Sequence, residues 1–444
     1  MSIRENYGII LRLGAPIMIG QLGMIVVGFA DNIMLGQYST HALSAASLVN
    51  NLFNVVIFAI LGFTYGLTPL LGALFGRNEH AEIGGMLRNG VVINIIFSLL
   101  ITGIMTIVYL NLHRLGQPAE LMPLIRPYFL IYLAGIVPIS LFNVFAQWAY
   151  AINRTKMPMW IILASNALNI AGNYALIYGH WGAPELGIVG AGLSTLAARI
   201  IAPALIIIIF CFGRQYNEYR CGYAQSRQQR RYWWKINRTS WPVSLQMVCE
   251  SGSFTAAAVM AGWLGVIELA SFQIIVIIGS LGFCIYYSMA SAVSVRVANA
   301  AGTGDTQGER AVAWAGYHIM LTLALAASLT FIFAGKSLIS IFTPDSAVVS
   351  LTLTLIFPLV LYQLGDATQI TFANALRGTS HVKPMMWIAA FSYLVVGVPA
   401  TYIMGFTLGM GLYGIILSFS VSLFIAAALF LYYFLHTTRT RDLR

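Results

Sequence analysis

Apolar positions in this 444-residue chain form long runs separated by short polar segments. A helix of about 20 residues crosses the ~30 Å hydrocarbon layer of a bilayer, and each run is long enough to do so. The runs are too long and unbroken for the alternating strands of a membrane β-barrel. The pattern therefore predicts an all-α integral membrane protein with twelve transmembrane helices, over residues 10–35, 46–75, 89–112, 127–150, 157–178, 187–213, 241–264, 270–295, 312–334, 347–373, 386–407 and 411–434.

The second half of the chain weakly repeats the first. Residues 226 positions apart match in the pairs Pro16/Pro242, Gly36/Gly262, Leu43/Leu269 and Gly76/Gly302. Each half holds six predicted helices, and because six is even both halves enter the membrane from the same side. This indicates a parallel pseudo-two-fold repeat. We expect an N-terminal six-helix lobe over residues 1–212, a cytoplasmic linker over 213–238 and a C-terminal six-helix lobe over 239–444.

Charge changes this picture by fixing an orientation. Hydrophobic residues make up 59% of the chain and charged residues 9%, far from the balance of a soluble domain. Of the 24 basic residues, 20 fall on the side of the N-terminus, three on the other side (Arg114, Arg126 and Lys336), and Arg199 lies inside a helix. The positive-inside rule then places both termini in the cytoplasm. The net charge of +10 therefore reports topology rather than nucleic-acid binding.

Three of the fourteen acidic residues lie inside predicted spans: Asp31, Glu250 and Asp366. A charge there costs about 2.5 to 3.5 kcal/mol on insertion scales, so each acid requires a cation, a proton or a polar pocket. The structural alternative is a protonated acid that only hydrogen-bonds neighbouring helices. Three such acids in one chain favour a functional role.

Polar residues of the first half can complete a site around Asp31. Asn169 and Asn173 are four positions apart, which puts them on one face of the fifth span, and Thr195 is early in the sixth. Their oxygens suit a hard cation such as Na⁺, and the same pocket can hold a proton on Asp31. The alternative is that the asparagines only join helices by hydrogen bonds, as is common in membranes.

A different set of polar residues marks the second half. Tyr362 and Asp366 are again four apart, and we expect them to face Glu250. The internal repeat does not superpose these acids, because Asp31 aligns with Ala257 and Glu250 aligns with Met24. The halves are therefore expected to share a fold and to carry different polar pockets.

The chain resembles the multidrug and toxic compound extrusion (MATE) transporters, most closely their NorM-type branch, over residues 8–435. The resemblance rests on Pro16, Asp31 with "DNIMLG", "LNIAGNYALIYG", "GAGLST", Glu250, "YQLGDATQ" and "ALRGT" (375–379), the last expected in a loop. It implies a V-shaped pair of six-helix lobes that export cationic amphiphilic compounds in exchange for Na⁺ or H⁺ by alternating access.

The resemblance also implies where the coupling ion binds. The first-lobe site maps onto Asp31, Asn169, Asn173 and Thr195, and the second-lobe site maps onto Glu250, Tyr362 and Asp366, with Na⁺ possible at either. Some branches carry a second acid where this chain has Asn173, so the choice between Na⁺ and H⁺ stays open. We expect a monomer of the bacterial cytoplasmic membrane, with small cations and the lipid bilayer as its partners and no cofactor.

Two other functions compete with export. A membrane-embedded enzyme needs a nucleophile with a base or a metal cluster, and the sequence has no G-x-S-x-G, no H-E-x-x-H and no histidine pair at metal-ligand spacing. A flippase for lipid-linked precursors, built on a related two-lobe fold, needs a strongly cationic cavity. Only Arg199 is a clear intramembrane base, which favours the transporter.

Overall fold

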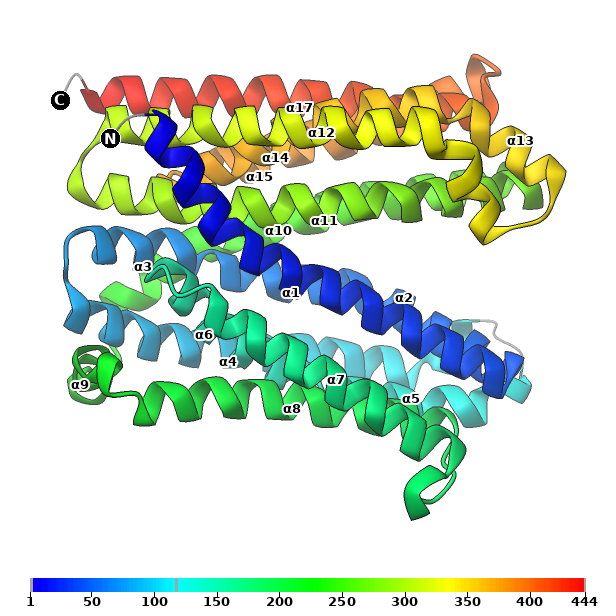
Figure 1. The fold of residues 1–444 in the computed structure, drawn as a ribbon, viewed down its shortest axis with the longest axis horizontal. Coiled ribbons are helices and arrows are strands. Elements are labelled where there is room, and N and C mark those ends of the chain that lie inside the picture. Colours follow the sequence, from blue (N-terminus) through cyan, green and yellow to red (C-terminus); the bar gives the residue numbers. More distant parts are fainter. Residues whose placement is uncertain (1–2, 116–118, 443–444) are drawn as a thin grey trace. The chain divides into compact units, whose positions relative to one another are not determined.

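The computed structural model describes residues 3–115 and 119–442, and nearly all of them are helical (Figure 1). The helices of the first half are α1 Ile3–Tyr38, α2 Thr40–Tyr65, α3 Leu67–Gly76, α4 His80–Leu110, η1 Leu112–Leu115, η2 Ala119–Leu121, α5 Met122–Ala134, α6 Ile136–Ala151, α7 Lys156–Tyr178, η3 His180–Gly182, α8 Ile188–Phe212, η4 Arg214–Tyr216 and α9 Asn217–Gln225. Those of the second half are α10 Arg230–Leu264, α11 Val266–Thr303, α12 Thr306–Phe342, α13 Ser346–Thr354, α14 Ile356–Gly378, α15 Lys383–Ala389, η5 Ala390–Gly397, α16 Val398–Tyr402, η6 Ile403–Thr407 and α17 Gly411–Asp442.

These helices confirm the predicted all-α membrane class. Within the described residues, ten helices are long and apolar enough to cross a bilayer, and the bent pair α13 and α14 adds an eleventh. The remaining predicted span, 241–264, lies in α10 and is less apolar because it carries Gln246, Glu250 and several serines. The twelve predicted spans thus all coincide with helices, although polar residues set α10 apart.

Several spans are broken where the sequence predicts one helix. α2 passes into α3 at Gly66, α5 passes into α6 at Gly135, and α13 and α14 meet at Leu355 with a bend of 47°. Gly66 is required by a close approach, because a Cβ there would lie 2.7 Å from the backbone nitrogen of Ser240. Such breaks leave carbonyl groups that neighbouring helices must satisfy in a membrane.

The described residues divide into two compact units. One unit comprises Ile19–Ser240, and the other comprises Met1–Met18 together with Trp241–Arg444. This grouping places the start of α1 with the C-terminal half and the whole of the 213–238 segment with the N-terminal half. The repeat-related Pro16 and Pro242 each lie within two residues of a boundary between the units.

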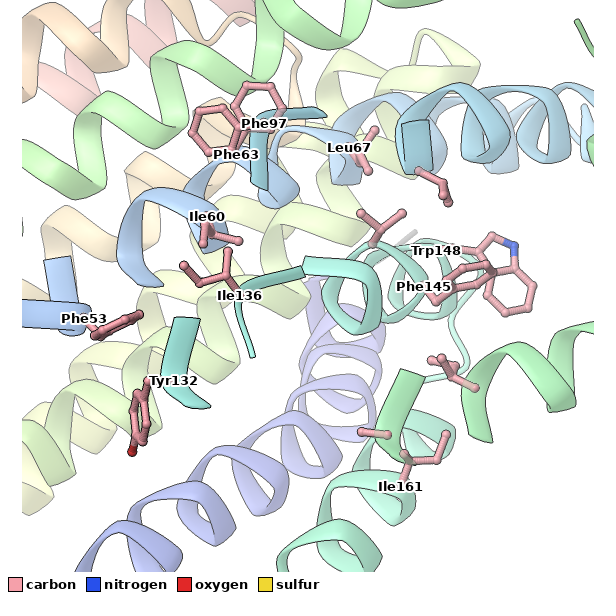
Figure 2. Close-up of a cluster of buried hydrophobic side chains, with 14 of the residues drawn as sticks. Phe53, Ile60, Phe63, Leu67, Phe97, Tyr132, Ile136, Phe145, Trp148 and Ile161 are labelled. Atoms are coloured by element: carbon pink, nitrogen blue, oxygen red, sulfur yellow. The ribbon is translucent and has the colours of Figure 1, made fainter. Parts of the chain in front are cut away.

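The unit of Ile19–Ser240 has an aromatic core (Figure 2). Phe63 of α2 stacks on Phe97 of α4 with ring centroids 4.1 Å apart, and the edge of the Trp148 ring meets Phe210 at 5.0 Å. Trp148 is fully buried. Because lipid is as apolar as these side chains, such close van der Waals contact is what holds membrane helices together.

The segment expected to be a cytoplasmic linker packs against α4. Helix α9 packs along α4, and Arg88 of α4 donates hydrogen bonds to the carbonyl oxygens of Ala224 (3.1 Å) and Ser226. The next residue, Asn89, accepts a hydrogen bond from the Gln229 backbone nitrogen at 3.1 Å. The carbonyls at the end of α9 are therefore satisfied by an arginine, which also suits the negative end of the helix dipole.

In the other unit, α14 packs against α11, α12 and α17 (Figure 1). An ion pair ties the start of α12 to the end of α17: Arg441 Nη1 lies 3.0 Å from the fully buried carboxylate of Glu309. Arg310 adds a hydrogen bond of 2.9 Å from its Nε to the Thr438 hydroxyl. These contacts fix the last turns of α17, although the sequence shows only a basic tail there.

Candidate functional site: two polar clusters around intramembrane acids

The structure brings the four predicted first-half residues together. Asp31 lies on α1, and the side-chain amide of Asn173 on α7 donates a hydrogen bond to its Oδ1. Asn173 also donates to Asn169 Oδ1 at 3.3 Å, and Asn169 Nδ2 lies 3.1 Å from Thr195 Oγ1 on α8. Asn169 and Asn173 are buried, as their four-residue spacing on one helix face predicts.

The Asn169 amide has a second orientation that satisfies its neighbours better. With oxygen and nitrogen exchanged, the nitrogen donates to Asp31 Oδ1 at 3.0 Å and the oxygen accepts from the Thr195 hydroxyl at 3.1 Å. In that arrangement Asp31 accepts from both asparagines. Such charge-assisted bonds stabilise an ionised carboxylate.

One hydrogen-bond acceptor of this cluster has no donor among the residues that the structure describes. Asn173 Oδ1 is buried and has no hydrogen-bond partner within the described part of the chain. A buried, unsatisfied oxygen costs about 1 to 3 kcal/mol, so its place beside a carboxylate favours a positively charged partner. Carboxylate, amide and hydroxyl oxygens are what a hard cation coordinates.

A cationic side chain lies near this cluster. The Arg199 guanidinium, on α8 one turn beyond Thr195, is 4.3 Å from the centroid of the Tyr132 ring, and it is close enough to Asp31 for their charges to interact. Gly135, at the break between α5 and α6, makes space for it: a Cβ there would lie 2.9 Å from Arg199 Nη1. The aromatic face of Tyr132 thus contacts the predicted intramembrane base.

The structure also brings the second-half residues together. Asp366 and Tyr362 are buried on α14, and Glu250 of α10 lies near enough to both for its charge to act on them. Glu250 is half-buried and hydrogen-bonds Gln246, one turn earlier on the same helix. Two carboxylates in one pocket repel, so they favour binding of a shared proton or cation.

Several buried acceptor oxygens on α10 and α14, the helices that carry this pair, have no donors within the described ranges. Asp366 Oδ2 and the side-chain oxygens of Gln246, Gln363 and Gln369 are buried and have no hydrogen-bond partner among the described residues. An isolated structural acid would be expected to find donors for its oxygens. A pocket rich in acceptors instead suits a bound cation or water.

The analysis of the sequence missed part of this cluster. Gln363 and Gln369 lie three residues either side of Asp366 on α14, and both are buried. Counting buried polar residues at helical spacing would have found them. Tyr393 could not have been found, because it comes from η5, a π-helical segment of the next span, and reaches the acids only through tertiary packing.

One predicted placement was wrong. "ALRGT" (375–379) was expected in a loop, but α14 continues to Gly378 and buries Arg377 in its last turn, where it is 3% exposed. Arg377 lies 3.4 Å from the Tyr287 hydroxyl and near enough to Glu250 for their charges to interact. Apolar residues around the motif extend the helix past the expected end of the span, so the second unit contains an inward basic group that the sequence did not indicate.

Known proteins are similar to this chain over most of its length. The MatE family model matches residues 16–175 and 242–403, segments that begin at the paired Pro16 and Pro242 of the internal repeat. A probable multidrug resistance protein NorM of Bradyrhizobium diazoefficiens is 28% identical over 427 residues, which cover 94% of this chain and 91% of that protein. The multidrug resistance protein PmpM of Pseudomonas aeruginosa is 29% identical over 418 residues, covering 92% and 86%.

Solved structures show the same fold. A MOP superfamily transporter from Pyrococcus furiosus superposes with a TM-score of 0.90 at 19% identity, over 98% of this chain and 97% of that one. An outward-facing multidrug resistance MATE family transporter of the same superfamily reaches a TM-score of 0.91 at 19% identity, over 99% and 97%. Because the family model matches most of both halves of the sequence, the chain belongs to the MatE family.

Proposed function

We propose that the chain is a secondary active antiporter that exports cationic, amphiphilic drugs or toxic metabolites in exchange for Na⁺ or H⁺ by alternating access. The relatives named as multidrug resistance proteins support the export of small molecules. The observation that carries the choice of a coupled mechanism is the Asp31 cluster, in which a carboxylate and a donorless amide oxygen lie together inside a transmembrane helix bundle.

Coupling requires that the ion change the affinity for the exported compound. An ion that binds two conformations with equal affinity does not shift the equilibrium between them. An ionised carboxylate in a cavity of low dielectric attracts a lipophilic cation, and neutralising it with H⁺ or Na⁺ removes that attraction. Export then follows when the ion enters from outside and displaces the compound.

The two clusters are suited to unequal roles. The first has one carboxylate, Asp31, opposed by Arg199, so a single H⁺ or Na⁺ neutralises it. The second has two carboxylates, Glu250 and Asp366, and, among the described residues, more side-chain oxygens without a hydrogen-bond donor than the first cluster has. We infer that the second cluster is the better Na⁺ site and that the first responds to either ion.

A flippase for lipid-linked precursors is the second candidate. Arg199 and Arg377 are the inward bases that favour it, since a phosphate head group needs cationic partners. Each of them lies close to an acid, Asp31 or Glu250, which offsets its charge. The charge balance of the clusters therefore favours a cationic substrate.

The deciding experiment uses the purified chain in proteoliposomes loaded with a cationic dye, with Na⁺ and H⁺ gradients imposed separately. We expect dye movement against its gradient with at least one ion and none without a gradient. The same preparation is assayed for scrambling of a fluorescent lipid. Lipid movement without gradient-driven dye movement would reject the antiporter in favour of the flippase.

The orientation and assembly state belong to the same proposal. The excess of basic residues on one side supports a multi-pass protein of the bacterial cytoplasmic membrane with both termini in the cytoplasm. Each polar cluster is complete within one unit of one chain, so no second copy is needed to form it. We infer a monomer that requires no cofactor beyond its coupling ion.

A further inference from the structure

Aromatic side chains gather where α1 and α7 end, beyond the Asp31 cluster. Tyr38 ends α1, Tyr174 and Tyr178 are in the last turns of α7, and His180 and Trp181 follow in η3. Their neighbour Glu185 is the acid of the same loop. We call these six residues the aromatic corner. All six belong to the unit of Ile19–Ser240.

The rings contact one another while staying open to solvent. Tyr174 lies 4.4 Å from His180 and 5.3 Å from Trp181 between ring centroids, and the planes of Tyr174 and Trp181 are inclined by 59°. Trp181 is 75% exposed and Tyr174 42%. Tyr178 is fixed by a hydrogen bond of 2.8 Å from its hydroxyl to the Met34 carbonyl. Trp181 thus packs against Tyr174, and the Tyr174 ring in turn lies 6.3 Å from the anchored Tyr178 ring.

The backbone holds Trp181 outward at a cost. Its φ of +58° is left-handed, a region that bulky residues rarely adopt, and it stands between two glycines in the same region, Gly179 (φ +72°) and Gly182 (φ +78°). A left-handed conformation of a non-glycine residue costs about 1 to 3 kcal/mol and persists where the surrounding structure enforces it. A glycine at position 181 would avoid this cost, so the exposed ring requires a reason.

Glu185 gives the corner a negative charge. Its carboxylate interacts with the Tyr38 hydroxyl, and its backbone folds against Gly179, where an added Cβ would lie 3.2 Å from the Glu185 nitrogen. The loop closes through a hydrogen bond of 2.9 Å from the Leu186 nitrogen to the Leu176 carbonyl. The carboxylate is therefore held next to the rings rather than left on a free loop.

We propose that the aromatic corner is a binding site for small organic cations of the quaternary ammonium and phosphonium class. Aromatic faces attract such cations through the ring quadrupole, and a nearby carboxylate adds a charge of the right sign. This inference rests on the proposed function, in which Asp31 binds the exported cation. Tyr38 is seven residues, about 10 Å of helix, beyond Asp31 on α1. The aromatic corner is then a second binding site, which an exported cation occupies after it leaves Asp31.

The alternative for exposed tryptophan and tyrosine is anchoring at the membrane surface, where aromatic belts occur. Glu185 and the close contact between the tilted rings of Tyr174 and His180 favour the cation site. A membrane anchor needs apolar ring area, whereas here the Tyr38 hydroxyl interacts with the Glu185 carboxylate, and Trp181 is held in a costly left-handed conformation. The experiment separates the two roles because only one of them predicts saturable cation binding.

Binding of radiolabelled tetraphenylphosphonium to the full chain is measured by scintillation proximity, with excess unlabelled cation defining the background. The measurement uses the triple variant Asp31→Asn, Glu250→Gln, Asp366→Asn, so that the inner clusters contribute no charge. We expect saturable binding to persist in this variant and to weaken about fivefold when Trp181→Ala or Glu185→Gln is added. Neutral triphenylphosphine oxide should not compete.

Trp160 supplies the matched control, because it is 65% exposed at the other end of α7. Trp160→Ala should leave binding unchanged. Trp181→Gly should weaken binding as Trp181→Ala does while melting at the same or a higher temperature, since it relieves the backbone cost.

Absence of saturable binding in the triple variant, or equal affinity with and without Trp181, overturns the proposal. A chain that binds the cation at the aromatic corner but fails to move dye in proteoliposomes would contradict the antiporter proposal and support the binding-site proposal. The failure of one proposal is therefore distinguishable from the failure of the other.

Discussion

The side-chain amide of Asn173 donates a hydrogen bond to Asp31, joining α7 to α1 across 142 positions of sequence. The bond holds an acid in the interior of a membrane protein beside an amide oxygen that has no donor among the described residues. A purely structural acid would be expected to have its neighbours satisfied. This pair is therefore the most direct place to test ion coupling.

Replacing Asp31 with asparagine should abolish gradient-driven export while the protein still inserts and folds. The variant removes the negative charge, which lowers the cost of burial, and keeps the shape of the side chain. Dye efflux from proteoliposomes and the melting temperature are measured together. Asn32→Ala, on the exposed neighbouring position of α1, is the control. Wild-type pumping by Asp31→Asn would make Asp31 a structural residue.

The second cluster should act as a unit. We expect the double variant Glu250→Gln, Asp366→Asn to lose ion-dependent release of the exported cation. Each single variant should already lose most of it, because the effects of substituting residues that share one function are not additive. Drug affinity is measured as a function of Na⁺ concentration and of pH. If the double variant keeps the full wild-type dependence on both, Asp31 is the sole coupling acid. Glu250 and Asp366 then only contribute negative charge to the cavity.

Topology is tested by labelling introduced cysteines with an impermeant thiol reagent on whole cells. A cysteine at exposed Gln225 should be shielded, and one at exposed Glu120 should react. Gln117, in the same loop as Glu120, lies outside the described residues. The exposed Cys211 and Cys221 are first replaced by serine. Labelling at position 225 with protection at position 120 would reverse the proposed orientation.

The ion pair between Arg441 and Glu309 predicts a stability effect without a transport effect. Arg441→Ala removes an ion-pair partner from the fully buried Glu309 carboxylate, although Arg441 itself is 26% exposed. We expect a loss of about 2 kcal/mol, less than for a fully buried pair because water screens part of the interaction. Thermal unfolding in detergent measures it, with exposed Arg439→Ala as the matched control. Equal melting of the two variants would show that the pair contributes nothing.

The sequence alone determined the membrane class and the positions of the helices. In lipid a helix must satisfy its own backbone hydrogen bonds, so an apolar run of sufficient length can adopt little else. It also indicated both polar clusters, because a charge inside such a run is costly and the spacing of Asn169 with Asn173, or Tyr362 with Asp366, is a local property of one helix.

Only the tertiary structure decided which helix faces meet. Helix packing in membranes depends on close contact spread over many small and apolar side chains, which leaves no periodic signal in the sequence. For that reason Tyr393 at the second cluster, the burial of Arg377 and the attachment of α9 to α4 could not be predicted. The outward ring of Trp181 belongs to the same class, because its left-handed backbone is imposed by the closed loop around it rather than by the residue itself.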